Sequence, residues 1–142
     1  MSSDPERFMR NLPYCAGLFD GEGCITTNGL PTGFRLSVTN TDRRLLEFLE
    51  SSLGGYINNQ YLPENPKWSR AWKWLVTDKN SVHQVLTALE PYLISKKDQA
   101  RVVIDFIEKH PNKRGTKMSE QKLSDWLSTK EALVGLKKQT GT

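Results

Sequence analysis

Two acidic residues, Asp20 and Glu22, stand near the end of residues 16–23, which we interpret as the last turns of a helix. Acids at a helix C-terminus face the negative pole of the helix dipole, at a cost of about 0.3 to 1 kcal/mol each, and a glycine inside a helix costs about 1 kcal/mol relative to alanine. Residues that break local rules in this way are expected at functional sites, where something outside the helix compensates. A bound cation would neutralise the carboxylates. The small residues that would let a second helix approach closely are Ala16, Gly17 and Gly21.

Other common chemistries have little support in the chain. Cys15 and Cys24 form no CxxC pair, and His83 and His110 are isolated, so a structural zinc site is not expected. No serine or cysteine stands beside a base in a pattern typical of covalent catalysis. Unpaired thiols fit a reducing compartment, and we therefore expect an intracellular protein.

Basic residues exceed acidic ones, with 20 Lys and Arg against 16 Asp and Glu and a net charge of +4. Such a mild excess indicates a nucleic-acid partner only weakly. Its distribution says more, because several basic residues fall in or beside predicted strands and loops, although each alone could belong to a solvated surface. They are Arg35, Lys67, Arg70, Lys73, Lys96 and Lys97.

The elements that must position these residues follow from hydrophobic spacing, caps and turn residues. We expect a helix that starts near Ser3, restarts at Pro13 and ends at Gly23 in a left-handed conformation. Two hairpins are predicted, with strands at 24–28 and 34–39 and at 56–61 and 71–77. Further helices are predicted from a cap at Thr41 to residue 53, over 81–89, from a cap at Ser95 to 110, and as two short helices in a tail of about 119–138.

This order predicts one α+β domain over residues 1–142, in which helices cover one face of an antiparallel sheet. Trp72 and Trp74 share a strand face and are expected to pack in the core. Polar residues recur with period two in the strands, so they should lie on the opposite face, where water or a partner would meet them. These residues are Thr26, Asn28, Arg35, Ser37, Asn58, Gln60 and Lys73.

The nonamer Cys15-Ala16-Gly17-Leu18-Phe19-Asp20-Gly21-Glu22-Gly23 resembles the LAGLIDADG motif of homing endonucleases, with a different first residue and Glu for the final Asp. The resemblance continues through residues 38–44 and 91–100. It implies a saddle-shaped sheet astride double-stranded DNA and a homodimer whose motif helices, about 13–23, pack at its centre. Such a protein hydrolyses phosphodiester bonds in both strands of a long, near-palindromic site.

The resemblance also implies roles for single residues. Glu22 would be the metal-binding carboxylate, and the carbonyl group of Gly21 would be a second ligand. Asn40 would position water or metal, while Lys96 and Arg43 would stabilise charge at the phosphate. Asn40 stands where similar single-motif enzymes have Gln, and the loop before Arg43 is one residue shorter, which leaves open whether Arg43 or Arg44 faces the site. The expected dimer contacts are Ala16, Gly17, Asp20 and Gly21.

Simpler readings remain for two of these residues. Asn40 could only cap the following helix, and Lys96 could be a solvated first-turn lysine.

The expected cofactor is Mg²⁺, with Mn²⁺ also active and Ca²⁺ supporting binding without cleavage. The expected partners are DNA and a second copy of the chain, with no membrane and no small-molecule cofactor, in a bacterial or phage cytoplasm or an organelle. The alternative function is a non-cleaving nucleic-acid-binding protein on the same scaffold, either an intron-splicing maturase or a transcriptional regulator. An RNA-binding module would need exposed aromatic residues on the sheet, for which Tyr56 is the one candidate.

Overall fold

The computed structural model describes residues 5–27, 33–61, 71–110 and 120–140. Their elements, in chain order, are α1 (Pro5–Glu22), β1 (Gly23–Thr27), β2 (Phe34–Asn40), α2 (Arg43–Leu53), β3 (Tyr56–Tyr61), β4 (Ala71–Val76), α3 (Lys79–Leu89), the 3-10 turn η1 (Glu90–Tyr92), α4 (Lys97–Lys109) and α5 (Glu120–Thr140). No helix of the described ranges is long and apolar enough to cross a membrane.

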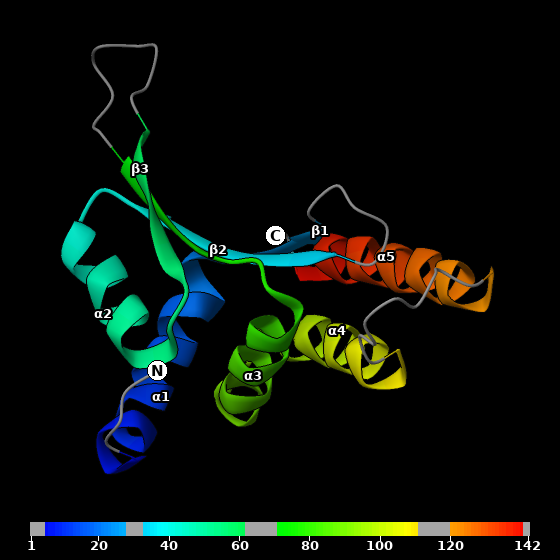
Figure 1. The fold of residues 1–142 in the computed structure, drawn as a ribbon, viewed down its shortest axis with the longest axis horizontal. Coiled ribbons are helices and arrows are strands. Elements are labelled where there is room, and N and C mark those ends of the chain that lie inside the picture. The colour runs from blue at the N-terminus through cyan, green and yellow to red at the C-terminus, as the bar shows by residue number, and fades with distance from the viewer. Residues whose placement is uncertain (1–4, 28–32, 62–70, 111–119, 141–142) are drawn as a thin grey trace.

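The four strands form one antiparallel sheet in the order β1-β2-β4-β3. Each predicted hairpin is present, β1 with β2 and β3 with β4, and the pairing of β2 with β4 joins them. Helices α1 to α4 lie on one side of this sheet, and α5 runs beside α4 at the end away from α2 (Figure 1). The structure thus confirms the predicted α+β arrangement.

The core lies between the helices and the covered face of the sheet, and every α-helix contributes to it. α1 buries residues at helical spacing, and Trp74 is the largest fully buried side chain. Its indole nitrogen donates to the carbonyl oxygen of Gly54 at 2.8 Å, so this polar atom has a partner inside the core. Trp72 is partly buried against the same cluster, as its shared strand face with Trp74 predicts. The α1 residues of the core are Leu12, Cys15, Ala16 and Phe19.

Several predicted element boundaries are wrong, among them the start of α3, which begins at Lys79 after a cap at Asp78 rather than at residue 81. α1 continues through Pro13, because the buried residues on both sides of the proline hold the helix against the core. Asp42, not Thr41, caps α2, since its carboxylate accepts from the amide of Arg44 at 3.0 Å. α4 has Lys96 rather than Ser95 at its N-cap position, and the tail from 120 to 140 is one helix instead of two.

Gly23 begins β1 directly after α1, and it is not in the left-handed conformation that we predicted. A Cβ atom at this position would lie 2.5 Å from the carbonyl oxygen of Phe19 and would also meet its ring. Close approach of the preceding helical turn is therefore the reason for a glycine here. The chain passes from helix to strand without an intervening loop.

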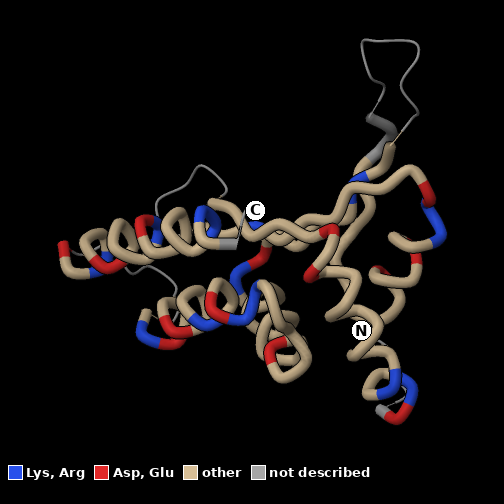
Figure 2. Tube along the Cα trace, turned by 180° about the vertical axis from the view of Figure 1, so that it is seen from behind, with Lys and Arg blue, Asp and Glu red and all other residues tan. Residues whose placement is uncertain are grey.

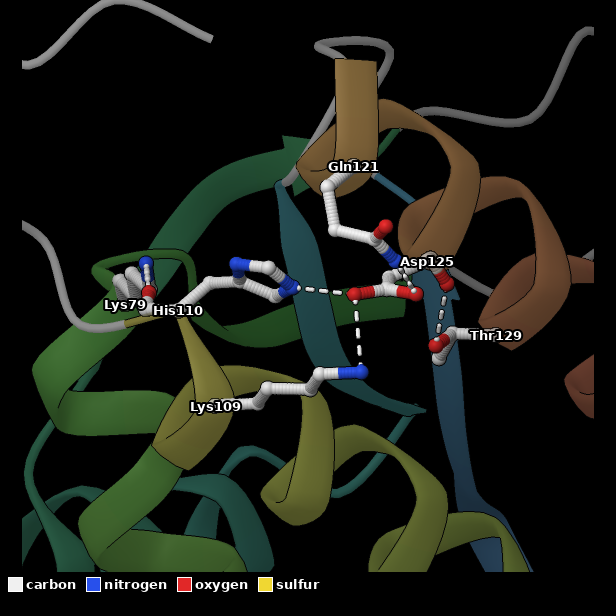
Figure 3. Close-up of polar contacts among 6 residues, drawn as sticks. All are labelled: Lys79, Lys109, His110, Gln121, Asp125 and Thr129. Carbon is white, nitrogen blue, oxygen red and sulfur yellow. Dashed lines mark hydrogen bonds and ion pairs between the residues drawn. The ribbon is translucent and has the colours of Figure 1, made fainter. Parts of the chain in front are cut away.

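A polar cluster fastens α5 to the end of α4 (Figure 3). Oδ2 of Asp125 lies 2.7 Å from Nε2 of His110 and 3.1 Å from Nζ of Lys109, while Gln121 donates to Oδ1 at 2.9 Å. The contact with His110, followed by that with Lys109, lowers the pKa of the Asp125 carboxyl group. Lys79 donates to the carbonyl oxygen of His110, which ties α3 to the same point.

Candidate functional site

Glu22 and Asn40, which are far apart in the sequence, meet at one end of the sheet. Gly23 pairs with Val38 in the register of β1 and β2, so Glu22, one residue earlier, lies beside the last residues of β2. The side-chain nitrogen of Asn40 lies 3.5 Å from Oε2 of Glu22. The Asn40 oxygen accepts from the amide of Asp42 at 2.8 Å, which orients the amide nitrogen toward the carboxylate. An exposed carboxylate and an oriented amide thus share the end of α1.

Asn40 is not the cap of α2. The capping residue of α2 is Asp42, and Asn40 forms the turn before it. Its position at the end of β2 leaves one face of the side chain for Glu22.

Lys96 lies beside the same end of α1, at the start of α4. Its Nζ donates to the carbonyl oxygen of Asp20 at 2.8 Å, and only 2% of the residue is exposed. The alternative of a solvated surface lysine is therefore wrong. Burial lowers the pKa of the Lys96 ammonium group, and the carboxylate of Asp20 opposes this shift.

The structure separates Arg43 from Arg44. The guanidinium group of Arg43 lies 5.9 Å from the ring centre of Trp72, which is the cross-strand partner of Asn40, and its Nε bonds to Glu47 at 3.1 Å. The guanidinium group of Arg44 instead forms two hydrogen bonds with the carboxylate of Asp42, at 3.0 and 2.8 Å, and the Arg44 side chain is 87% exposed. Arg43 is the arginine on the side of Asn40.

The uncovered face of the sheet carries most of the polar residues that period-two spacing assigns to it. The register places Thr26 opposite Arg35 in one row, and Thr39, Lys73 and Asn58 in another. Ser37 is on the same face but only 8% exposed. Sequence reasoning missed Thr39, although the same spacing could have found it. Asn28 and the side chain of Gln60 lie outside the described residues.

Charge on the four described strands is entirely basic. Their charged residues are Arg35 and Lys73, which both lie on the uncovered face, while the helices carry both signs (Figure 2). The sheet is otherwise built from neutral residues. This face offers hydrogen-bonding groups and positive charge, the combination that suits a polyanion.

A family model described as LAGLIDADG-like domain matches residues 12–89, more than half of the chain of 142 residues. The chain belongs to the LAGLIDADG family. The match includes the second part of α1 with Asp20 and Glu22, the whole described sheet, α2 and α3. The resemblance of residues 15–23 to the family motif is thereby confirmed.

Solved structures of homing endonucleases share the fold. I-CvuI, in complex with its target in the presence of 2 mM calcium, is 20% identical with a TM-score of 0.59, over 96% of this chain and 98% of that one. The archaeal intron-encoded I-Vdi141I, complexed with DNA, is 18% identical with a TM-score of 0.69, over 89% and 84%. I-SmaMI, bound to an uncleaved DNA target, is 20% identical with a TM-score of 0.66, over 93% of this chain and 49% of that one. No curated protein sequence matches this chain significantly.

The LAGLIDADG helix α1 has one face that no other part of the described subunit covers. Gly17 and Gly21 are exposed about one turn apart, and a Cβ atom at either glycine would meet nothing within 4 Å. Tyr14 is also exposed, although its ring contacts Phe48 of α2. Ala16 is 0% exposed and packs in the subunit's own core, so its predicted dimer contact is wrong. Asp20 is half-buried, and its carboxylate accepts from amides of the same chain.

Proposed function

We propose that this protein is a site-specific, double-stranded DNA endonuclease that acts as a homodimer with a divalent metal ion. The observation that carries the proposal is the position of Glu22. It ends the LAGLIDADG helix as an exposed carboxylate beside Asn40, at one end of a sheet whose uncovered face is polar and basic. A protein that only bound DNA would not need this acid at the negative end of a helix.

The residues at the end of α1 fit a magnesium site. Glu22 offers carboxylate oxygens, and Gly21 is in the last helical turn, where backbone carbonyl groups have no partner within the helix. Such oxygen ligands suit Mg²⁺, which keeps several waters and shares the phosphate of its substrate. When bound, the ion would activate water and offset the negative charge that develops at phosphorus. Manganese would replace it in cleavage, and calcium would support binding alone.

Side chains around Glu22 would orient the attacking water and place positive charge near the phosphate. Asn40 would orient water through its amide nitrogen, which already faces the carboxylate. Lys96 would place positive charge near the phosphate while one of its three N–H donors stays on Asp20. Arg43 would contribute from the side of β4, because Trp72 holds its guanidinium group there.

The strands would read the DNA sequence through the major groove, which admits a two-stranded ribbon. Arg35 and Lys73 supply charge, and Asn58 supplies neutral hydrogen-bonding groups on the same face. Ser37 and Thr26 contribute least, because Ser37 is nearly buried and the hydroxyl oxygen of Thr26 is buried without a hydrogen-bond partner in the described subunit. Asn28 and Gln60 remain predicted contacts.

Two copies of the chain would assemble through the exposed face of α1. One chain carries one Glu22, and cutting both strands requires two such sites, which symmetry supplies together with a near-palindromic target. The open glycines accept a close helix, and Ile94, 87% exposed beside the end of α1, extends the apolar surface. The match to about half of I-SmaMI, 49% of that chain, is consistent with a unit that works in pairs.

An intracellular site of action, in a bacterial or phage-infected cytoplasm or an organelle, is part of the proposal. Cys15 and Cys24 are free thiols, which suits a reducing compartment.

Cleavage and binding by Glu22→Gln test the proposal. The wild type is incubated with a randomised DNA library with and without magnesium, and sequencing of the new ends gives the site. On that site we expect Glu22→Gln to lose at least about 100-fold in cleavage, since it removes the charge that holds the ion. Its affinity in calcium should stay within about 3-fold, because the strand contacts persist.

Three outcomes discriminate between the possibilities. Wild-type cleavage retained by the variant would exclude Glu22 as the metal ligand. Loss of both cleavage and binding would give Glu22 a structural role at the dimer centre. Sequence-specific binding by the wild type without cleavage in magnesium or manganese would favour the maturase or regulator alternative.

A further inference from the structure

The end of α1 and the start of α4 hold each other through three hydrogen bonds. Asp20 accepts from the amide of Ile94 at 2.7 Å with Oδ2 and from the amide of Lys96 at 3.0 Å with Oδ1. In the opposite direction, Nζ of Lys96 donates to the carbonyl oxygen of Asp20 at 2.8 Å. We call this arrangement of Asp20 and Lys96 the reciprocal clamp.

Each of the two residues of the clamp provides a hydrogen-bond partner for backbone groups at the end of the other residue's helix. The N-cap residue of α4, Lys96, has no side-chain capping bond, and the carboxylate of Asp20 supplies an acceptor there. The last carbonyl groups of α1 also lack intrahelical partners, and the ammonium group of Lys96 supplies a donor. Each charge suits the dipole of the opposite helix, because the Asp20 carboxylate lies at the N-terminus of α4 and the Lys96 ammonium group at the C-terminus of α1, which offsets the unfavourable place of each charge on its own helix.

The clamp holds the helical turn that carries the proposed metal ligands. Asp20 immediately precedes Gly21 and is two residues before Glu22, so an anchored Asp20 leaves the following residues little freedom. Asn40 approaches Glu22 from the other side, at 3.5 Å, with a weaker contact. Asp20 differs from Glu22 in that both of its carboxylate oxygens already accept backbone hydrogen bonds.

We infer that Asp20 is a positioning residue for the proposed cleavage, which acts through the reciprocal clamp by fixing the Gly21–Glu22 turn and the Lys96 ammonium group relative to Asn40. This inference rests on the proposed function. A displacement of about 1 Å in a catalytic group can cost on the order of 100-fold in rate, whereas DNA contacts made by the strands do not depend on this turn. Loss of the clamp should therefore reduce the rate of cleavage and spare the affinity for DNA.

The first experiment measures kcat, KM and calcium-supported DNA affinity for Asp20→Ala, Asp20→Asn and the control Asp98→Asn. Asp98 is an exposed acid in the first turn of α4, so its replacement removes the same charge from the same helix end without touching α1. We expect kcat to fall about 10- to 100-fold in Asp20→Ala, with KM and affinity within about 2-fold. Asp20→Asn keeps one acceptor oxygen and should fall in between, while Asp98→Asn should match the wild type.

The second experiment repeats these measurements in a Lys96→Met background, which keeps the aliphatic stem but removes the ammonium group. Groups that act as one unit show non-additive effects. With the clamp already broken, Asp20→Asn should lower kcat by less than about 3-fold further. Amide hydrogen exchange at Ile94 and Lys96 should accelerate in each Asp20 variant, which reports the clamp independently of cleavage.

The outcomes separate this inference from the proposed function. If the wild type cuts and both Asp20 variants cut equally well, the positioning role is overturned while the nuclease stands. Fully multiplicative effects of Asp20→Asn and Lys96→Met overturn the clamp as a unit. A fall in affinity that equals the fall in kcat would make Asp20 merely structural. A wild type that cuts no DNA refutes the nuclease and this role with it.

Discussion

A side chain at Gly17 should separate the stability of the subunit from that of the dimer. A Cβ atom there meets nothing within 4 Å in the described subunit, so Gly17→Leu causes no clash inside one chain. The substitution also replaces glycine, which disfavours helix, with leucine, which favours it, and this difference in helix propensity should stabilise α1 by about 0.8 kcal/mol. The isolated subunit should therefore become slightly more stable. In a dimer that packs α1 against its twin, the same leucine would occupy space that the partner helix needs.

The size of the second effect follows from symmetry. Overpacking costs about 1 to 3 kcal/mol per site, and a two-fold interface contains the substitution twice, so the dimer should lose about 2 to 6 kcal/mol. Because 1.4 kcal/mol corresponds to a factor of ten, the dissociation constant of the dimer should increase by a factor of between about 25 and about 10⁴. Gly135→Leu is the matched control, because Gly135 is also an exposed helical glycine with nothing within 4 Å, on α5.

Sedimentation over a dilution series, with and without target DNA, measures the dissociation constants of the wild type and both variants. Urea unfolding at a concentration below dimer formation measures the subunit. Both variants should unfold at equal or higher urea, and Gly17→Leu alone should dissociate. An undisturbed Gly17→Leu dimer would show that the exposed glycine face of α1 is not the interface. A strictly monomeric wild type on DNA would refute the dimer itself.

Other described residues give three further predictions. If Arg35 or Lys73 contacts a base, its replacement by Ala should relax the sequence preference at one symmetric pair of target positions and weaken binding to the preferred site by about 1 to 3 kcal/mol. If the residue contacts a phosphate instead, the same replacement should weaken binding to all sequences equally and make the affinity less dependent on salt. If both variants bind as the wild type does, the uncovered face does not bind DNA. The pKa of Asp125 is lowered from its ordinary value of 3.8, so its contribution to stability is present above that value and lost as pH falls through the lower, folded pKa. Asp125→Asn should therefore be less stable at pH 7 and lose less on acidification, as thermal unfolding at pH 7 and pH 2 to 4 would show. Burial raises the pKa of Cys15 to about 11, whereas Cys24 is partly exposed, so an alkylating reagent at neutral pH should modify Cys24 in the native protein and Cys15 only after unfolding.

Much of the fold could be predicted because its signals are local. Period-two spacing located all four strands and placed Thr26, Arg35 and Lys73 on one face, since alternation along a strand is fixed by the backbone. Ala16 shows where a local signal was misread. It lies between Leu12 and Phe19 on the buried stripe of α1, and this spacing assigns it to the core rather than to a second helix.

The parts of the site that could not be predicted depend on contacts between distant segments. Asp20 and Lys96 are 76 positions apart, and nothing in either neighbourhood indicates that each caps the other's helix. Asp20 is unfavourably placed for the dipole of an isolated α1, but in the folded protein the N-terminus of α4 offsets that cost. The sequence also could not show whether Arg43 or Arg44 faces the site. The answer depends on the contact of Arg43 with the Trp72 ring of β4 and on the hydrogen bonds between Arg44 and Asp42.

The direct passage from α1 into β1 makes Glu22 the joint between a helix and a strand. The backbone at Gly23 has little freedom to move, because the helical turn of Phe19 fills the space that a side chain at this position would need. In a dimer joined through α1, the distance between the two Glu22 carboxylates would be dictated by how the two helices cross. The stagger between the cuts in the two DNA strands would then be a property of backbone geometry. Redesign of the strand residues could change which DNA sequence is chosen while leaving the shape of the cut ends unchanged.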